Sequence, residues 1–418
     1  MISHLLTGTY KLIRIIVTPT KRAEKVKYDS SMNKIINRKE KKLTQAGLRA
    51  FHKYASIMVL VLTGILAGLL FRQLTALRMD FYNELWGPAY LLTQGQSPYD
   101  TSSLNTNLPA AWFPMAIGFF SPLGWLSENS ALQFWFIFNI IEICMIIYIA
   151  QGDKLSIYNT VILALLCLFF PPTLNHFSLG QISITVALCL MLAVHFANTE
   201  RHWLSAFFVA LAFSKPHLAI LAGLGLSYHY YLRGKIRGMM VFWGRTLLIS
   251  LGLCLPLFIA YPNWMPDAIL SMTQNPPWLY PSLFILFHRY LGAWGYVLWG
   301  VASLTAIWLG YLLWKKLPSA NAMVWSLALA PVLSPYVGSW DFVLLLPLLI
   351  STYARIDLKR KIFIIVLYAI AWYGMALVQM QESSHNHFFW WVPLWFLGMS
   401  ALVTNWRTDR SSGSTQPV

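Results

Sequence analysis

The sequence predicts an all-α fold, a polytopic transmembrane helical bundle with about 12 crossings, and three observations lead to it. Of the 418 residues, 57% are hydrophobic and only 11% are charged, a composition typical of chains that cross a bilayer several times. Many apolar runs reach the roughly 20 residues that a crossing needs; the runs at 131–150 and 239–260 each contain a single charged residue. Basic residues gather in short connections between runs, as on the cytoplasmic side of membrane proteins.

A basic arm precedes the first apolar run. Residues 1–53 hold 13 Lys/Arg and three acidic residues, so the arm carries 10 of the 16 net positive charges (13 minus 3). We expect this arm to lie in the cytoplasm against anionic lipid headgroups. Nucleic-acid binding is not expected, because the aromatic residues lie in the apolar runs instead of between the charges. The first run begins only near Tyr54, which indicates a retained anchor and no cleaved signal peptide.

Thirteen apolar segments follow, and the basic connections between them set the orientation. The connections at 233–238, 315–321 and 354–361 carry the positive charge of the second half, so they and both termini should be cytoplasmic. We therefore divide the chain into the arm 1–53, a membrane domain 54–405 with a first outer loop at 72–112, and a tail 406–418. The expected helical segments are 54–71, 112–126, 131–150, 157–174, 182–197, 203–213, 217–232, 239–260, 293–314, 322–334, 341–353, 361–379 and 388–405.

The number of crossings between the arm and the connection at 233–238 must be even, yet seven segments lie there. Either residues 112–126, about 22 Å of helix, lie at the surface or re-enter the membrane, or residues 203–232 form one helix kinked at Pro216. We favour the first topology, because it keeps Lys154 and Arg201 inside and leaves the loops "SEN" and "NHFSLGQ", which have no Lys or Arg, outside. That choice gives twelve crossings.

Four cations beyond the arm are then left near the outer face, against the positive-inside rule. Ionisable groups at membrane depth cost free energy and often mark functional sites. These cations are Arg72, Arg78, Lys215 and Arg289.

A carboxylate pair, Asp80 and Glu84, follows the first apolar run. Their spacing of four places both on one face if the segment is helical. The pair fits either a functional site or an ordinary interfacial belt of acidic and aromatic residues.

Two further stretches could bind an anion. In "SKPH", Lys215 and His217 flank Pro216, which fits a helix start whose backbone N–H groups favour negative charge. The alternative is a snorkelling lysine beside a kink. In "LFHRYLG", His288 and Arg289 follow the outer loop at 261–281, and an arginine fork matches phosphate oxygens. A contact with a lipid headgroup explains them equally well.

Several motifs in order give the chain a resemblance to glycosyltransferase family 87, over residues 80–350. They are Asp80, Tyr82 and Ala89, then "LLTQGQSPYD", "WFP", "SPLGWL", "LGQISITVALCLMLA", "ALAFSKPHLAILAGLGLSYHYYLRGKIRG", "NPPWLYPSLFILFHRYLG" and "LSPYVGSWDFVLLLPLL". The resemblance implies a glycosyltransferase-C-like membrane enzyme of the plasma (bacterial inner) membrane, with no cofactor. Such an enzyme moves a sugar from a polyprenyl-phosphate-linked donor to an acceptor hydroxyl on a glycolipid or glycan at the outer face, with a hexose or pentose as the sugar and mannose favoured.

The family places its base, an aspartate, in the first outer loop, and the position that matches here is Asp80. Two departures limit what can be carried over. Many relatives have histidines after a late Ser-Trp pair, whereas this chain has Trp340 followed by Asp341, and the relatives' early Tyr-Pro-Pro is "WFP" here. No histidine role is therefore transferred to the late motif.

The residues allow a simple mechanism, because a polyprenyl phosphate is already a good leaving group. We expect Asp80 to take the acceptor proton, and cations to hold the departing phosphate. The phosphate-binding candidates are Lys215, His217, His288 and Arg289. The candidates for binding the sugar or acceptor are Tyr82, Glu84, Tyr99, Gln181, Trp340 and Asp341.

A different function class fits some of the same residues. In a lipid-linked sugar flippase or anion transporter, Lys215 and the broken helix at Pro216 would form an anion site without chemistry. Transporters of this kind usually contain internal repeats, and the two halves of this chain show none.

The four cysteines lie in apolar runs without Cys-x-x-Cys spacing, and we expect neither a disulfide nor a metal site.

Overall fold

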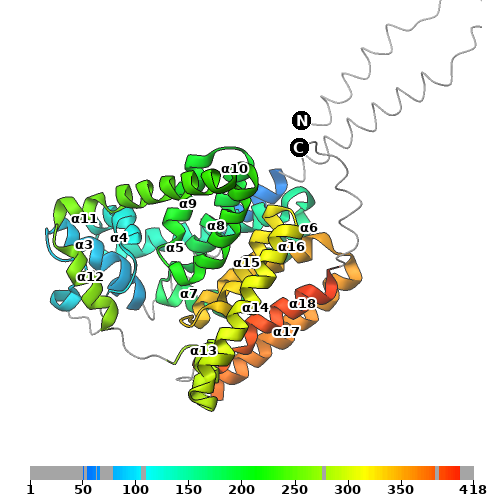
Figure 1. Ribbon diagram of the computed structural model, residues 1–418. Helices are drawn as coiled ribbons and strands as arrows, with labels where there is room; N and C mark the ends of the chain where they lie inside the picture. Colours follow the sequence, from blue (N-terminus) through cyan, green and yellow to red (C-terminus); the bar gives the residue numbers. More distant parts are fainter. Residues whose placement is uncertain are drawn as a thin grey trace, which may run out of the picture. The chain divides into compact units, whose positions relative to one another are not determined.

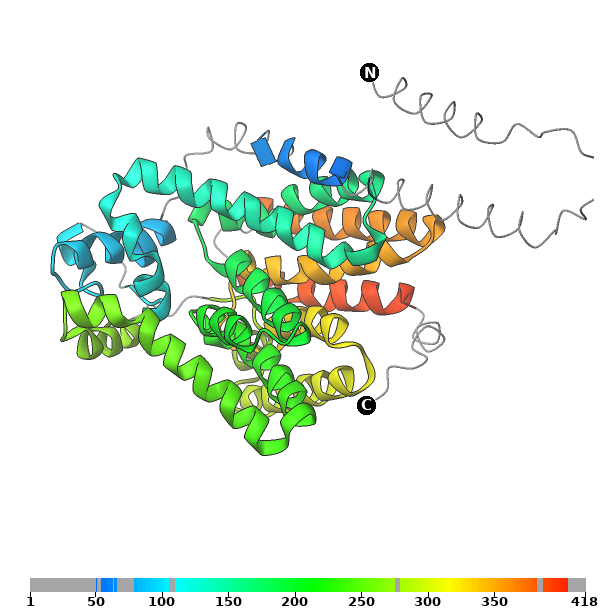
Figure 2. The ribbon, with the colours of Figure 1, turned by 90° about the horizontal axis from the view of Figure 1, so that it is seen from above.

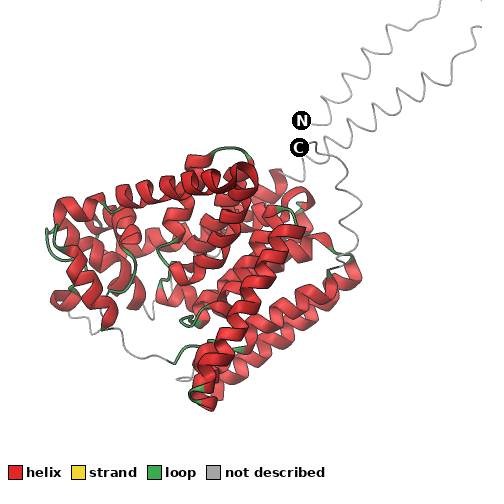
Figure 3. Ribbon diagram, in the orientation of Figure 1, coloured by secondary structure: helices red, strands yellow, loops and turns green. Residues whose placement is uncertain are grey.

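The computed structural model describes residues 50, 54–62, 64–65, 79–104, 110–274, 279–381 and 386–404. In these ranges the regular structure is helical and no strand occurs, which confirms the predicted all-α class (Figure 3). Residues 1–51 form a unit of their own, of which only Ala50 is described. The predicted basic arm, apart from that residue, and the tail at 406–418 lie outside the described residues. The remainder concerns the second unit, residues 52–418.

Short helices and two long ones make up the first half of this unit. A helical stretch at 54–62 comes first. The elements that follow are η1 (Phe81–Trp86), α3 (Gly87–Thr93), η2 (Thr101–Leu104), α4 (Pro114–Phe120), η3 (Ser121–Trp125), α5 (Glu128–Gln151), η4 (Gly152–Lys154), α6 (Ile157–Leu168), α7 (Pro171–Leu179), α8 (Ser183–Asn198), α9 (His202–Ala212) and α10 (Pro216–Leu253).

Longer helices dominate the second half. They pack pairwise, with α15 between α10, α14 and α16, and α18 against α15, α16 and α17 (Figure 1). The elements are α11 (Leu255–Ala260), α12 (Trp264–Thr273), α13 (Leu283–Leu291), α14 (Trp294–Lys316), α15 (Ser319–Leu333), η5 (Ser339–Leu345), α16 (Leu346–Arg355), α17 (Leu358–Gln381), η6 (Asn386–Phe389) and α18 (Trp391–Val403).

Four described helices are long and apolar enough to cross a membrane, namely α5, α14, α17 and the joined α10–α11. Helices α6 and α7, bent by 59° at their junction, form one more span if counted together. Three shorter apolar helices, α8, α9 and α15, accompany them. The twelve crossings counted from the sequence stay a prediction.

Helix α10 turns back on itself within its 38 residues. The backbone leaves helical geometry at Lys235, whose φ is 54°. On either side of this turn the rings of Tyr230 and Phe242 stack at 4.2 Å, and Trp243 Nε1 donates to Ser227 Oγ at 2.8 Å. The two arms therefore lie antiparallel near the turn, as the V-shaped green ribbon in Figure 2 shows, in agreement with the two apolar runs predicted around "RGKIRG".

The segment at 112–126 contains only α4 and η3. Seven residues of α4 span about 10 Å, a third of the roughly 30 Å hydrocarbon core. Helices α9 and α10 are separate, and α10 begins at Pro216, as the sequence predicts. Which of the early segments does not cross the membrane stays a prediction.

Three apolar cores hold the unit together. The largest involves α5 to α10 and α14 to α18. A second surrounds η1, where Phe81 packs with Trp135 and Ile182, and a third joins α3 and α4 to α11 and α12 through Tyr99 and Trp264 (Figure 1).

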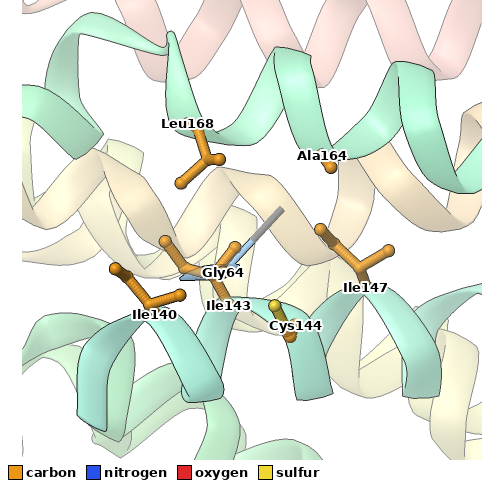
Figure 4. A pocket seen from close by; sticks show the side chains of 7 residues that line it. All are labelled: Gly64, Ile140, Ile143, Cys144, Ile147, Ala164 and Leu168. Carbon is orange, nitrogen blue, oxygen red and sulfur yellow. The ribbon is translucent and has the colours of Figure 1, made fainter. Parts of the chain in front are cut away.

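A small apolar pocket lies among Gly64, α5 and α6 (Figure 4). Its lining offers no charged or hydrogen-bonding side chain beyond a thiol, so we do not place the chemistry there. That lining is Gly64, Ile140, Ile143, Cys144, Ile147, Ala164 and Leu168.

Candidate functional site

Four side chains that are far apart in the sequence form one hydrogen-bonded chain. Gln181 Nε2 donates to Asp80 Oδ2. Lys215 Nζ donates to Gln181 Oε1 at 2.5 Å and pairs with Asp341 Oδ1 at 3.0 Å. All four had been predicted as site residues, and the structure brings them together as Asp80–Gln181–Lys215–Asp341, here called the polar chain.

Asp80 lies at the start of η1, a π-helix. The wider turn closes with the Gly87 N–H donating to the Tyr82 carbonyl, and a Cβ at residue 87 would collide with that carbonyl. Single π-turns occur often at functional sites, because they re-aim side chains. Here the turn leaves Phe81 in the core and Asp80 facing Gln181.

Gln181 is held by the turn that ends α7. Gly180 has a φ of 73°, which favours glycine, and a Cβ there would also collide with Phe81. The His176 carbonyl accepts the N–H groups of Gly180 and Gln181 at 2.9 and 3.1 Å. The sequence "LGQ" thus fixes where the Gln181 amide lies, and 3% of this residue is exposed.

Lys215 occupies the break between α9 and α10 and is 7% exposed. Its ammonium group has three hydrogens, and it has three acceptors: Gln181 Oε1, Ser183 Oγ at 3.2 Å and Asp341 Oδ1. Since a lysine can only donate, the Gln181 oxygen must face Lys215 and its NH₂ must face Asp80. The lysine therefore fixes the orientation of the amide.

Asp341 is held in the first turn of η5. Its Oδ2 accepts the Gly338 N–H at 2.8 Å, and its Oδ1 accepts from Ser183 as well as from Lys215. Asn175 Nδ2 donates to Ser339 Oγ at 2.9 Å, which ties α7 to the same turn. Both oxygens of Asp341 thus accept hydrogen bonds, and 1% of this residue is exposed.

Burial dominates the acid strength of the two carboxyl groups near η1. It raises the pKa of Asp80 to about 6, although the hydrogen bond from Gln181 and the charge of Lys215 oppose the shift. Burial and the nearby charge of Asp80 raise the pKa of Glu84 to about 8, against the N–H groups of Ala111 and Trp112. These two amides reach Glu84 Oε2 at 2.5 and 2.9 Å. Near pH 7, Glu84 is protonated and Asp80 is largely ionised.

The pKa of Asp341 is shifted in the opposite direction, downward. Burial pushes its pKa upward, but Lys215, His217, Ser183 and the Gly338 N–H together hold the pKa below its ordinary value. It is an ionised counter-ion to Lys215 at all ordinary pH values.

The other predicted phosphate-binding residues lie on α10 and α13. His217 follows Lys215 in α10, and its ring meets Tyr336 edge-on at 5.3 Å; within the described chain its Nε2 has no hydrogen-bond partner. His288 and Arg289 are exposed on α13, which packs mainly on α14. Among the described residues, neither makes a hydrogen bond or ion pair with the polar chain.

The predicted aromatic residues have local contacts. Tyr82 OH donates to the Leu104 carbonyl at 3.3 Å. Tyr99 OH donates to the Trp112 carbonyl at 3.2 Å and is buried, which raises its pKa. The Trp340 ring covers Gly338. Trp112, which was predicted only as part of "WFP", lies with its ring 5.8 Å from Lys215 Nζ.

Ser183 is the site residue that the sequence did not reveal. Its hydroxyl accepts from Lys215 and donates to Asp341, so it bridges the ion pair. Its only sequence signal is its place two residues after Gln181.

Arg72 and Arg78, the two remaining outer cations, lie outside the described residues. No group of three or more His, Cys, Asp or Glu that could hold a metal ion occurs among the described residues.

The model of glycosyltransferase family 87 matches residues 113–335, which are 223 of the 418 residues. Gln181 and Lys215 lie inside the matched range, whereas Asp80 and Asp341 flank it. No curated protein matches the chain. Because the matched range covers more than half of the chain, this protein belongs to glycosyltransferase family 87 and is a membrane glycosyltransferase.

Proposed function

We propose that the protein transfers a hexose or pentose, with mannose favoured, from a polyprenyl-phosphate-linked donor to an acceptor hydroxyl at the outer face of the plasma membrane. In this proposal the fold is glycosyltransferase-C-like with about 12 crossings, and both termini are cytoplasmic. The acceptor is a glycolipid or glycan. The observation that carries the proposal is the polar chain from the half-buried Asp80 to the buried Asp341.

Asp80 is the general base of this proposal. Gln181 bonds to its Oδ2, and within the described residues no donor bonds to its Oδ1. The acceptor O–H gives its proton to this free oxygen while the acceptor oxygen attacks the anomeric carbon. The bond between that carbon and the phosphate oxygen breaks, and the polyprenyl phosphate leaves with the electron pair. A base whose pKa of about 6 lies close to the working pH is well matched to this task.

The proposed role of Lys215 differs from the direct phosphate binding that the sequence suggested. Its three hydrogens already have acceptors, so direct contact with the donor phosphate requires one acceptor to leave. We propose that Lys215 mainly orients Gln181 and, through its charge, favours the anionic leaving group. His217, whose Nε2 has no partner in the described chain, is the predicted phosphate ligand with a free ring nitrogen.

A transfer assay tests the proposal. Purified protein in vesicles is incubated with polyprenyl phosphate carrying radiolabelled mannose, arabinose, galactose or glucose, with and without a membrane-extract acceptor. We expect acceptor-dependent release of free polyprenyl phosphate with one sugar, mannose first. Movement of intact donor across the bilayer without cleavage would instead establish a flippase and refute the proposal.

A further inference from the structure

A second group of charged side chains lies at the other end of α9 and of the first arm of α10. Lys215 precedes both Pro216 and the arm that ends at the 233–235 turn, so 18 residues, about 27 Å of helix, separate it from Arg233. Arg233 Nη1 donates to the Ala197 carbonyl at the end of α8 at 2.7 Å. Nearby, the Arg245 guanidinium lies 5.2 Å from the ring of Trp203. We call this region the basic corner.

The basic corner has more positive than negative charge. The segments 200–203 and 229–245 contain five Lys/Arg and a single acidic residue, Glu200. Among the described residues, Arg233, Lys235 and Arg245 form no ion pair with a carboxylate. Arg233 and Arg245 both lie close enough to His202 to act on it electrostatically. Such an excess of unpaired cations is stabilised by an anion from outside the chain.

The turn itself keeps a lysine where glycine would be less strained. Lys235 has a φ of 54°, in the left-handed region, whereas the neighbouring Gly234 has a φ of −137°, which any residue adopts. The Lys235 ammonium lies 5.9 Å from the ring of Tyr231. Residues with strained backbone angles cluster at functional sites, which makes the Lys235 side chain a candidate binding group.

The surroundings of the basic corner distinguish a lipid from a soluble anion. Apolar side chains flank the cations and are exposed: Trp203 by 53%, Ile236 by 61% and Met240 by 65%. A free phosphate gains nothing from such a surface, whereas a phospholipid places acyl chains against it. We propose that the basic corner binds the headgroup phosphate of an anionic phospholipid, with the acyl chains along α9 and α10.

Native mass spectrometry of the full-length protein in detergent tests this site. Phosphatidylglycerol is titrated, with phosphatidylcholine as the neutral-headgroup comparison. We expect Lys235→Gln/Arg245→Gln to weaken phosphatidylglycerol binding about 25-fold, because each cation near an anionic headgroup contributes about fivefold. Arg233 is left in place, since it also bonds to the Ala197 carbonyl.

Two variants control for charge and for folding. Lys359→Gln/Arg360→Gln removes the same charge from α17, where Arg360 already pairs with Asp357 at 3.5 Å, and should leave the affinity within twofold. Lys235→Arg/Arg245→Lys keeps the charge and should retain binding. Equal losses in the two Gln pairs, or binding of inorganic phosphate but not of phosphatidylglycerol, would overturn the proposal. Neither result bears on sugar transfer, because the polar chain lies at the other end of these helices.

Discussion

The aspartates at the two ends of the polar chain differ in their hydrogen-bond partners and in their pKa. At the η5 end, Asp341 pairs with Lys215 at 3.0 Å and receives the Gly338 N–H, and its pKa is lowered. At the η1 end, Asp80 receives one hydrogen bond from the described residues, donated by the neutral Gln181 amide, and its pKa rises to about 6. Removal from water raises the pKa of both carboxyl groups, so their partners decide the difference.

This difference gives the two carboxylates separate roles in the proposed mechanism. An ionised Asp341 with three hydrogen-bond donors is a poor base, because protonation would weaken its contacts with Lys215, Ser183 and Gly338. Asp80 exchanges its proton near neutral pH and keeps one oxygen free. Two neighbouring titratable groups whose environments move their pKa values apart commonly mark the acid–base group and its support. The predictions below test this division.

The largest expected effect comes from removing the base. Asp80→Asn should lower transfer by about 10²- to 10⁴-fold, measured as release of polyprenyl phosphate. The folded protein holds the Asp80 proton more tightly than the unfolded chain does, so ionising Asp80 lowers stability from about pH 4 to pH 6 and the cost persists at pH 7. The variant should therefore melt at least as high as the native protein at pH 7.

Asp267→Asn is the matched control for this variant. Asp267 lies on α12 and accepts from Ser97 Oγ at 2.5 Å, outside the polar chain. It should keep nearly full activity. Equal activity in the Asp80→Asn protein would remove Asp80 from the mechanism.

Removing the central cation should destabilise the Asp341 end most. Lys215→Met leaves Asp341 buried and unpaired, which costs about 3–5 kcal/mol of unfolding free energy, measured by thermal or denaturant unfolding in micelles. Lys215→Met/Asp341→Leu should recover most of that stability but not the activity, because Gln181 still lacks its fixed orientation. Recovery of both would show that Lys215 serves stability alone.

The pH profile should report the Asp80 end. Activity depends on ionised Asp80, so it should rise tenfold per pH unit below a pKa of about 6 and level off above it. At pH 5 we expect about a tenth of the plateau rate. Initial rates between pH 4.5 and 8.5 measure this, with circular dichroism to confirm folding at each pH. A flat profile across pH 6 would contradict the assignment.

Removing the link between the two ends should give a smaller effect with a distinct signature. Gln181→Leu deletes the hydrogen bond that lowers the pKa of Asp80. A hydrogen bond to a charged group contributes about 1.5–3 kcal/mol, so the inflection of the pH profile should move up by about one to two units. A loss of rate without that movement would indicate a merely structural role for the amide.

The smallest effect is expected at Arg289. Arg289→Gln changes an exposed side chain on α13 that makes no hydrogen bond or ion pair with the polar chain among the described residues, and it should change the transfer rate by less than twofold. The rate at saturating donor measures it. A loss of rate comparable to that of Lys215→Met would indicate that Arg289 contacts the donor phosphate, and would contradict this prediction.

Much of the site could be predicted because its residues stand out against an apolar background. Asp80, Gln181, Lys215 and Asp341 are polar residues in greasy surroundings, and each lies next to a glycine or proline signal or begins a helix. Ser183 was not singled out although it begins α8, since a serine hydroxyl at a helix start is most simply explained by a bond to the local backbone. The grouping of Arg289 with Lys215 was suggested by charge and side of the membrane alone, which do not fix lateral distance.

The sequence by itself determined the helical class, the breaks at Pro216 and around residues 233–238, and the candidate polar residues, because periodicity, proline and glycine act locally. Only the tertiary structure decided which acceptors Lys215 takes, that its hydrogens are saturated, and that Asp80 and Asp341 have opposite acid strengths. Those properties depend on distances of about 3 Å between segments more than 100 residues apart, and burial and hydrogen bonding at that range follow from packing, which no local pattern encodes.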